Sequence, residues 1–262
     1  MGKLGLFTLL LVLTPLLASA QTPSPQDIDA DNIDPMSQRT GQQVFSRIAT
    51  ALNPSSCTTA ASQSTWMKHY IHDPRRFERQ LQTMLPYLDH VSIEIQRRGL
   101  PMEYALIPFV ESRYLPKAVA KGGPTGLWQL MPATAKHYGL KIGGKQDGRY
   151  SVVEATRAAL DYLELIHGHF NHWQTGIMAY NAGDSRLRIN LRRQNLQVAD
   201  ANAKLPKGLA PHTYAYVKKI QALSCFFMEP TRFDVRLPDE ARFDPLVPGL
   251  VPDPSVPLDN GN

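Results

Sequence analysis

Apolar residues recur at intervals of three and four through much of the chain. Between Asp73 and Gly99 they fall at Phe77, Leu81, Met84, Leu88, Val91 and Ile95, which is the spacing of one helix face. Asp73 precedes Pro74 as an N-cap precedes proline at the first helical position, and Gly99 follows the last apolar residue. The pattern predicts a long amphipathic helix, bent at Pro86, and a second helix that opens at Pro101.

Two more helices are predicted downstream. Ser151 and Glu154 have the spacing of a capping box, and apolar residues continue at helical intervals to Ile166. A short apolar helix is predicted from Trp173 to Tyr180, ended by the Asn-Ala-Gly that follows. These helical patterns together predict a mainly α protein.

The two ends of the chain lack this periodicity. Residues 1–20 combine Lys3, an apolar run and Ala18-Ser19-Ala20, which is typical of a secretory signal peptide. We therefore expect export, to the periplasm of a bacterium. Residues 21–42 are polar and predict a disordered leader; residues 229–262 hold seven prolines and predict a largely extended tail. One domain is expected between them, over residues 43–228, and no later apolar run is long enough to span a membrane.

Composition adds expectations about partners. The formal net charge of +5 suits association with an anionic polymer such as a cell wall, and an exported chain is not expected to bind nucleic acid. Cys57 and Cys225 flank the predicted core, and export to an oxidising compartment favours a disulfide between them. The alternative is two separately buried thiols.

Glu111 is the main candidate for chemistry. It follows an apolar run from Ala105 to Val110, and apolar surroundings keep a carboxyl group protonated near neutral pH, so that it can act as a general acid. Protonated carboxyl groups of this kind cleave glycosidic bonds. Taken alone, however, a glutamate at the end of an apolar helix is usually a solvated helix end. The interpretation therefore depends on the motifs around it.

Three motifs follow one another in order. They are Glu111-Ser112 with Tyr114 and Pro116, then GLWQLMPATA over residues 126–135, then Ala179-Tyr180-Asn181-Ala182-Gly183; a weaker fourth is the Tyr-Val segment at Tyr216. Their order and spacing resemble the lytic transglycosylases of the lysozyme superfamily that carry the soluble-lytic-transglycosylase (SLT) catalytic domain, within them the membrane-bound lytic murein transglycosylase D group. The resemblance covers about residues 70–228. It implies a mainly α, lysozyme-like fold of the goose-type lysozyme/SLT kind, with flexible N- and C-terminal segments.

The resemblance also implies an activity. In that family the substrate is peptidoglycan, and the β-1,4 bond between N-acetylmuramic acid and N-acetylglucosamine is cleaved to leave 1,6-anhydromuramic acid ends, without a metal or organic cofactor. Carried to this chain, Glu111 is the single catalytic acid and base. The substrate-binding candidates that the resemblance supplies are Ser112, Gln129, Tyr180, Asn181 and, more weakly, Tyr216. Trp128 is expected to be either a core aromatic or a platform for a sugar ring.

One departure from the family pattern is visible, since Ala120 stands where a serine is common. That loss predicts an altered rate or preference, and it leaves open a wall-binding protein without turnover. A muramidase that uses water normally needs a second carboxylate, for which Asp147, Asp161 and Asp184 are available.

Two other features have competing interpretations. His167, His169 and His172 suggest a zinc-dependent wall hydrolase, yet offsets of two and three do not place three ligands on one helix face. The arginines of residues 184–193 predict a solvated helical face, with contact to acidic stem peptides as the lesser alternative.

Overall fold

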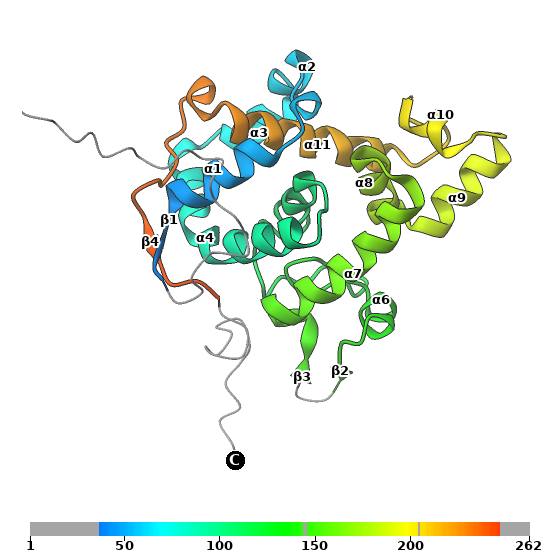
Figure 1. The fold of residues 1–262 in the computed structure, drawn as a ribbon, viewed down its shortest axis with the longest axis horizontal. Helices are drawn as coiled ribbons and strands as arrows, with labels where there is room; N and C mark the ends of the chain where they lie inside the picture. Colours follow the sequence, from blue (N-terminus) through cyan, green and yellow to red (C-terminus); the bar gives the residue numbers. More distant parts are fainter. Residues whose placement is uncertain (1–36, 144–145, 204, 247–262) are drawn as a thin grey trace, which may run out of the picture.

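The structure, a computed structural model, describes residues 37–143, 146–203 and 205–246 (Figure 1). The predicted signal peptide, most of the predicted leader and the end of the predicted tail lie outside the described residues. The α-helices are α1 Gly41–Ala51, α2 Thr59–Ser62, α3 Thr65–Ile71, α4 Pro74–Arg97, α5 Ile107–Ser112, α6 Pro132–His137, α7 Val152–Phe170, α8 Trp173–Ala182, α9 Asp184–Arg193, α10 Val198–Ala203 and α11 Pro211–Met228. The mainly α architecture expected from the sequence is confirmed.

Short 3₁₀ turns and strand pairs connect the helices. The 3₁₀ turns are η3 Pro54–Ser56, η4 Met102–Leu106, η5 Gly148–Tyr150 and η6 Pro230–Phe233. Strand β1 Arg39–Thr40 pairs antiparallel with β4 Arg242–Phe243, and β2 Ile142–Gly143 pairs with β3 Gln146–Asp147. Strands this short carry no apolar alternation, so the hydrophobic pattern did not predict them.

Helix α4 begins where the sequence predicted, since the Asp73 side chain accepts a hydrogen bond from the Arg76 backbone N–H at 3.0 Å. It continues through Pro86 to Arg97 as one helix. Its apolar face is buried, with Leu81 and Leu88 fully inaccessible. Full burial of side chains of this kind contributes about 1.5–3 kcal/mol each.

Helix α11 is the central packing element. It contacts α8, α2, α1 and α3 (Figure 1), and Ile220, Leu223 and Phe226 on it are fully buried. Helices α7 and α8 pack against each other beside it. A single apolar core therefore connects the first and last helices of the described chain.

The predicted domain boundaries at 43 and 228 need correction at both ends. Thr40 and Gln43 form a capping box that starts α1, so residues 39–42 belong to β1 and α1 and not to a leader. Arg39 is buried because its guanidinium pairs with Asp89. At the other end η6 and β4 return to the domain, where β4 pairs with β1. Polarity misled the prediction here, because these segments are held by caps, ion pairs and strand pairing.

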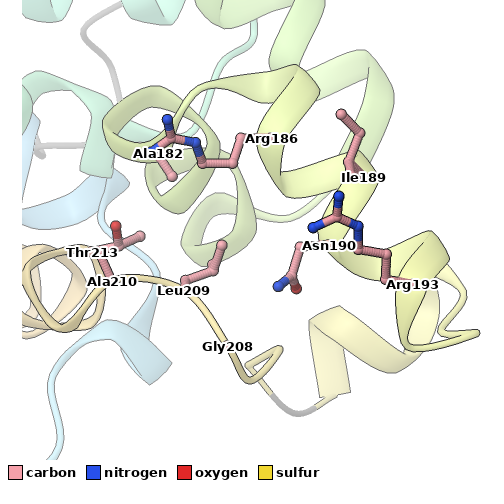
Figure 2. A pocket seen from close by; sticks show the side chains of 9 residues that line it. All are labelled: Ala182, Arg186, Ile189, Asn190, Arg193, Gly208, Leu209, Ala210 and Thr213. Carbon is pink, nitrogen blue, oxygen red and sulfur yellow. The ribbon is translucent and has the colours of Figure 1, made fainter.

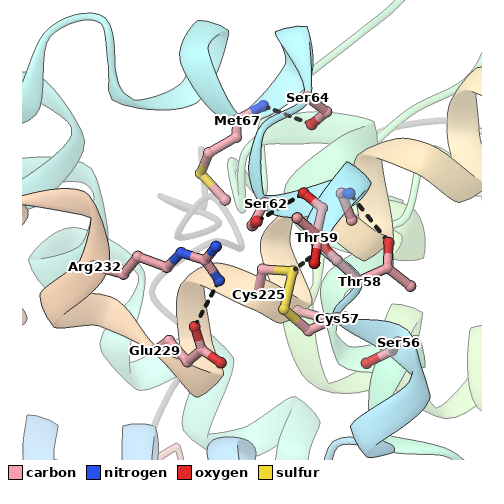
Figure 3. Close-up of a disulfide and its surroundings, with 12 residues drawn as sticks. Ser56, Cys57, Thr58, Thr59, Ser62, Ser64, Met67, Cys225, Glu229 and Arg232 are labelled. Atoms are coloured by element: carbon pink, nitrogen blue, oxygen red, sulfur yellow. Dashed lines mark hydrogen bonds and ion pairs between the residues drawn. A yellow bond between two sulfur atoms is a disulfide. The ribbon is translucent and has the colours of Figure 1, made fainter.

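Cys57 and Cys225 form a disulfide with a Cα–Cα distance of 4.6 Å (Figure 3). Cys57 follows η3, whereas Cys225 lies in α11. The bond therefore ties the segment around η3 and α2 to the central helix.

Candidate active site

Glu111 lies in the last turn of α5. The segment that leads to Glu111 is buried, because η4 and the first residues of α5 form part of the core. The chain then turns sharply, with Arg113 and Tyr114 at positive φ values of 55° and 59°. The Tyr114 hydroxyl donates to the Ala105 carbonyl at 2.6 Å, which fixes this turn against the start of the segment.

Ser112 is a structural residue and does not line an open cleft. Its side chain is buried, and its hydroxyl donates to the Leu127 carbonyl at 2.7 Å. The same oxygen accepts from the Leu115 backbone N–H at 3.2 Å. The prediction that Ser112 contacts substrate is therefore corrected, because its hydroxyl is used to join α5 to the loop that holds Leu127.

The Glu111 carboxyl is half-buried and accepts a hydrogen bond from the Tyr216 hydroxyl at 2.7 Å. Burial raises the pKa of Glu111, and the Tyr216 hydrogen bond and the charge of Lys219 offset part of that rise. Burial also raises the pKa of Tyr216, with the charge of Glu111 adding to it. The phenol therefore stays protonated as a donor, and Glu111 holds its proton at a higher pH than an ordinary glutamate does.

The loop of residues 118–130, which is joined to α5 by the Ser112–Leu127 hydrogen bond, depends on one glycine. Gly126 has φ +80°, and a Cβ there would lie 1.8 Å from the Arg149 carbonyl oxygen. The Arg149 side chain in turn donates to the Gly123 and Leu130 carbonyls at 2.6 and 3.1 Å. Backbone packing and one buried arginine thus set the shape of the loop.

Gln129 also shapes this loop. Its backbone is left-handed, with φ 48°, and its amide nitrogen donates to the Ala118 and Gly126 carbonyls at 3.1 and 2.8 Å. The side chain is half-buried, so contact between Gln129 and a glycan stays a prediction. Ala120 lies exposed nearby, where it offers no hydroxyl.

Trp128 belongs to the core. Its side chain is fully buried, and its indole N–H donates to the Thr156 hydroxyl at 3.0 Å. A buried indole with a satisfied N–H has no face left for a sugar ring. Of the two alternatives for Trp128, the structure therefore supports the core aromatic and not the platform for a sugar ring.

Tyr180 and Asn181 lie together in the last turn of α8, which runs to Ala182, past the predicted end. The Tyr180 hydroxyl donates to the Trp128 carbonyl at 2.8 Å. Burial raises the pKa of Tyr180 and the charge of Glu111 adds to the rise, so the two groups are within electrostatic range. Asn181 accepts from the Thr213 hydroxyl at 2.9 Å, which joins α8 to α11 beside Tyr216.

Two aromatic residues that were not predicted as site residues lie in line with Tyr180. The Tyr162 ring lies 5.8 Å from that of Tyr180, and the Tyr138 ring lies 5.5 Å from that of Tyr162. All three are half-buried. Tyr180 lies in α8, Tyr162 in α7 and Tyr138 directly after α6. No local sequence pattern indicates that these three aromatic residues are neighbours in space. Lys219, which affects Glu111 from α11, was missed for the same reason.

The acidic residues considered as a second carboxylate are occupied elsewhere. Asp147 pairs with Arg149 at 2.6 Å. Asp161 pairs with Arg98 at 2.7 Å, and Asp184 pairs with His169 at 2.9 Å.

The three histidines also have separate surroundings. His167 lies 3.3 Å from the Tyr104 hydroxyl, His169 pairs with Asp184, and His172 stacks beside Trp173. Across the described ranges, no group of three or more His, Cys, Asp and Glu side chains is arranged to hold a metal ion. Those ranges also contain no helix that is both long and apolar enough to cross a membrane.

Comparison with known proteins accounts for this arrangement. Residues 92–202 match the family model described as the transglycosylase SLT domain. Membrane-bound lytic murein transglycosylase D of Escherichia coli (strain K12) is 34% identical over 180 residues, which are 67% of this chain and 38% of the relative. A putative tributyltin chloride resistance protein of Alteromonas sp. (strain M-1) is 39% identical over 127 residues, 48% of this chain and 56% of the relative.

A phage protein is also similar. Peptidoglycan transglycosylase gp16 of Escherichia phage T7 is 37% identical over 83 residues, 31% of this chain and 6% of its own length. The chain thus spans 38% of the length of the Escherichia coli relative. The family match includes Glu111, Gln129, Tyr180 and Asn181, whereas Tyr216 and both cysteines lie outside it. Together with the helical fold and the site on this segment, the match shows that the chain belongs to the transglycosylase SLT family, with its lysozyme-like domain.

Proposed function

We propose that this chain is a peptidoglycan lytic transglycosylase that cleaves the β-1,4 bond between N-acetylmuramic acid and N-acetylglucosamine. The observation that carries the proposal is the half-buried Glu111, whose pKa is raised by burial and whose carboxyl group is oriented by Tyr216. The names of the relatives, which include a lytic murein transglycosylase and a peptidoglycan transglycosylase, support the same substrate.

Glu111 acts first as the acid and then as the base. The protonated carboxyl gives its proton to the glycosidic oxygen as the bond from that oxygen to C1 of muramic acid breaks. The resulting carboxylate takes the proton of the C6 hydroxyl while O6 bonds to C1. No water is consumed, and Glu111 ends in the protonation state in which it began.

Attack by the substrate's own hydroxyl removes the need for a second carboxylate. This agrees with the ion pairs that occupy Asp147, Asp161 and Asp184. The Tyr216 hydroxyl has a distinct part in the cycle. Its hydrogen bond stabilises the carboxylate that forms after the first proton transfer.

The proposed glycan contacts are Gln129, Tyr180 and Asn181, with Tyr216 beside the catalytic group. They come from three separate parts of the fold, namely the 118–130 loop, α8 and α11. The proposed location is the bacterial periplasm, reached by the signal peptide predicted for residues 1–20; the "membrane-bound" murein enzyme among the relatives supports an envelope location.

Mass analysis of the products from purified glycan strands tests the proposal. Internal attack leaves a non-reducing 1,6-anhydro end, which is one water lighter than the reducing end left by hydrolysis and is unchanged by borohydride. We expect anhydromuropeptides from the parent chain, formed about 10²- to 10⁴-fold more slowly by Glu111→Gln. Predominantly reducing ends would instead establish a hydrolase, and binding without any product would establish a wall-binding protein.

A further inference from the structure

A cavity of about 490 Å³ lies between α9 and the segment that leads into α11 (Figure 2). The lining residues are Ala182, Arg186, Ile189, Asn190, Arg193, Gly208, Leu209, Ala210 and Thr213. Figure 2 shows the α9 side chains on one side of it and residues 208–213 on the other. None of these residues takes part in the proposed proton transfers.

The cavity is electropositive. Arg186 and Arg193 are both exposed, and within the described part of the chain neither has an ion-pair partner. By contrast, Arg188 on the same helix pairs with Asp184 at 3.2 Å, which also neutralises the acid at the start of α9. Two uncompensated guanidinium groups at the edge of one cavity favour an anionic ligand, since each offers paired N–H donors that match a carboxylate.

The wall of the cavity is held in place without a ligand. The Gln194 amide nitrogen donates to the Asn190 side chain at 2.7 Å and to the Lys207 carbonyl at 2.9 Å. Gly208 has φ +76°, and a Cβ there would lie 3.3 Å from the Asn190 amide nitrogen. The 207–210 segment is therefore fastened to α9, and a preformed cavity of this kind binds at a low ordering cost.

The cavity adjoins the proposed active site. Thr213 lines it and also donates to Asn181, and Ala182 follows Asn181 directly. On α11, Thr213 and Tyr216 are three residues apart, which is about 4.5 Å along the helix axis, and Tyr216 contacts Glu111. A peptide of four residues reaches about 13 Å when extended, so a peptide attached to a sugar beside Glu111 is longer than the step from Tyr216 to Thr213 at the cavity wall.

We propose that this cavity binds the carboxylates of the stem peptide carried by muramic acid, with Arg186 and Arg193 as the ligands. The inference rests on the proposed function, because it names the part of the same substrate that extends beyond the cleft. It also gives the arginines of α9 a role beyond solvation of the helix.

Binding of a soluble probe tests the site without requiring turnover. The probe is the free tetrapeptide L-alanyl-D-isoglutamyl-meso-diaminopimelyl-D-alanine, titrated into the full chain while the backbone amide signals of Gly208 and Leu209 are followed by NMR. We expect saturable shifts that weaken with added salt. Arg186→Gln/Arg193→Gln is expected to weaken binding about tenfold or more, since hydrogen bonds between charged groups are lost.

The matched control is Arg192→Gln/Arg75→Gln, which removes the same charge from exposed positions that do not line the cavity. It is expected to change the affinity by no more than about twofold. Equal weakening by both double variants would show a general charge effect and overturn the proposal. A parent chain that gives no shifts at Gly208 and Leu209 would overturn it as well.

Kinetics with two substrates then locate the effect. On glycan strands that keep their stem peptides, the Arg186→Gln/Arg193→Gln variant should lose kcat/KM about tenfold through KM; on strands stripped by an amidase it should match the parent. Equal loss on both substrates would assign the arginines to the glycan and contradict the peptide site. If the parent chain is inactive on both while the tetrapeptide still binds, the proposed function fails and the peptide site stands.

Discussion

At the scale of single residues, three effects set the protonation state of Glu111, one of them opposed by the other two. Burial raises its pKa, whereas the Tyr216 hydroxyl and the Lys219 charge lower it. Burial is the largest of the three, so the acid form is favoured at the start of the reaction. The two smaller effects keep the carboxylate accessible for the second step, in which Glu111 must accept a proton.

Replacing Glu111 with Gln keeps the shape of the side chain and removes its proton. Turnover of peptidoglycan should fall by about 10²- to 10⁴-fold, the usual value of general acid-base assistance. Glu103→Gln is the matched control, because Glu103 is buried with a raised pKa but its carboxyl accepts from the Asn53 backbone N–H, whereas the Tyr216 hydroxyl donates to Glu111. Parental activity in a folded Glu111→Gln protein would remove Glu111 from the mechanism.

Replacing Tyr216 with Phe should change the pH dependence. The Tyr216 hydrogen bond lowers the pKa of Glu111, so its removal raises that pKa further. The acid form is then lost at a higher pH, so the alkaline limb of the kcat/KM profile should shift to higher pH. The maximal rate should fall, because the carboxylate loses its hydrogen-bond donor. A pH profile from about pH 4 to 9 measures the limb; a lower rate with an unmoved limb would mean that Tyr216 only packs.

At the scale of elements, the long amphipathic helices α4 and α7 were predictable, whereas the helix predicted to open at Pro101 is the 3₁₀ turn η4 followed by α5. The loop around the site was not predictable. The ends of α4 followed from Asp73-Pro74 and Gly99 because these signals are local. The shape of the 118–130 loop depends instead on Arg149, Ser112 and the Gly126 contact, which join residues distant in sequence. Trp128 shows the same limit, since whether an aromatic is buried is decided by its neighbours in space.

A single methyl group at Gly126 tests how the loop is held. The added Cβ would lie 1.8 Å from a backbone oxygen at a positive φ, so Gly126→Ala must displace the backbone near Glu111. We expect a loss of at least about 3 kcal/mol in the free energy of unfolding, measured by urea titration, and loss of activity.

Gly122→Ala is the control in the same loop. Gly122 also has a positive φ, 93°, but a Cβ there meets nothing within 4 Å. Gly122→Ala should lower the free energy of unfolding by only about 1–2 kcal/mol, which is the cost of a left-handed backbone conformation. Equal effects of the two substitutions would show that backbone conformation, and not the contact with Arg149, limits the loop.

At the scale of the whole molecule, the ends of the described chain are tied to its centre. Strand β1 pairs with β4, and Asp89 in α4 accepts hydrogen bonds from the buried Arg39 and Arg47. Removal of one member of such a buried ionic group leaves charge unpaired, which is costly. These contacts keep α1 against α4, on the side of the molecule opposite α9 (Figure 1).

The disulfide makes a second long-range connection, because Cys57 and Cys225 are separated by 168 residues. In the loop-closure account, opening the disulfide restores chain entropy to the unfolded state, which lowers the free energy of unfolding by about 5 kcal/mol. The Cys57→Ser/Cys225→Ser variant should therefore unfold at a lower urea concentration than the oxidised parent. It should keep its activity at temperatures at which it is folded, because Glu111 and Tyr216 are joined by their own hydrogen bond.

Reduction of the parent is the matching control. A reductant should bring the parent's unfolding midpoint down to that of the double variant and leave the variant unchanged. Thiol labelling of the folded, exported parent with intact-mass measurement should find no reactive cysteine and a mass two hydrogens below that of the reduced chain. Two labelled thiols in that protein would show that the bond does not form, and equal urea midpoints with the bond intact would show that closure of this loop does not stabilise the fold.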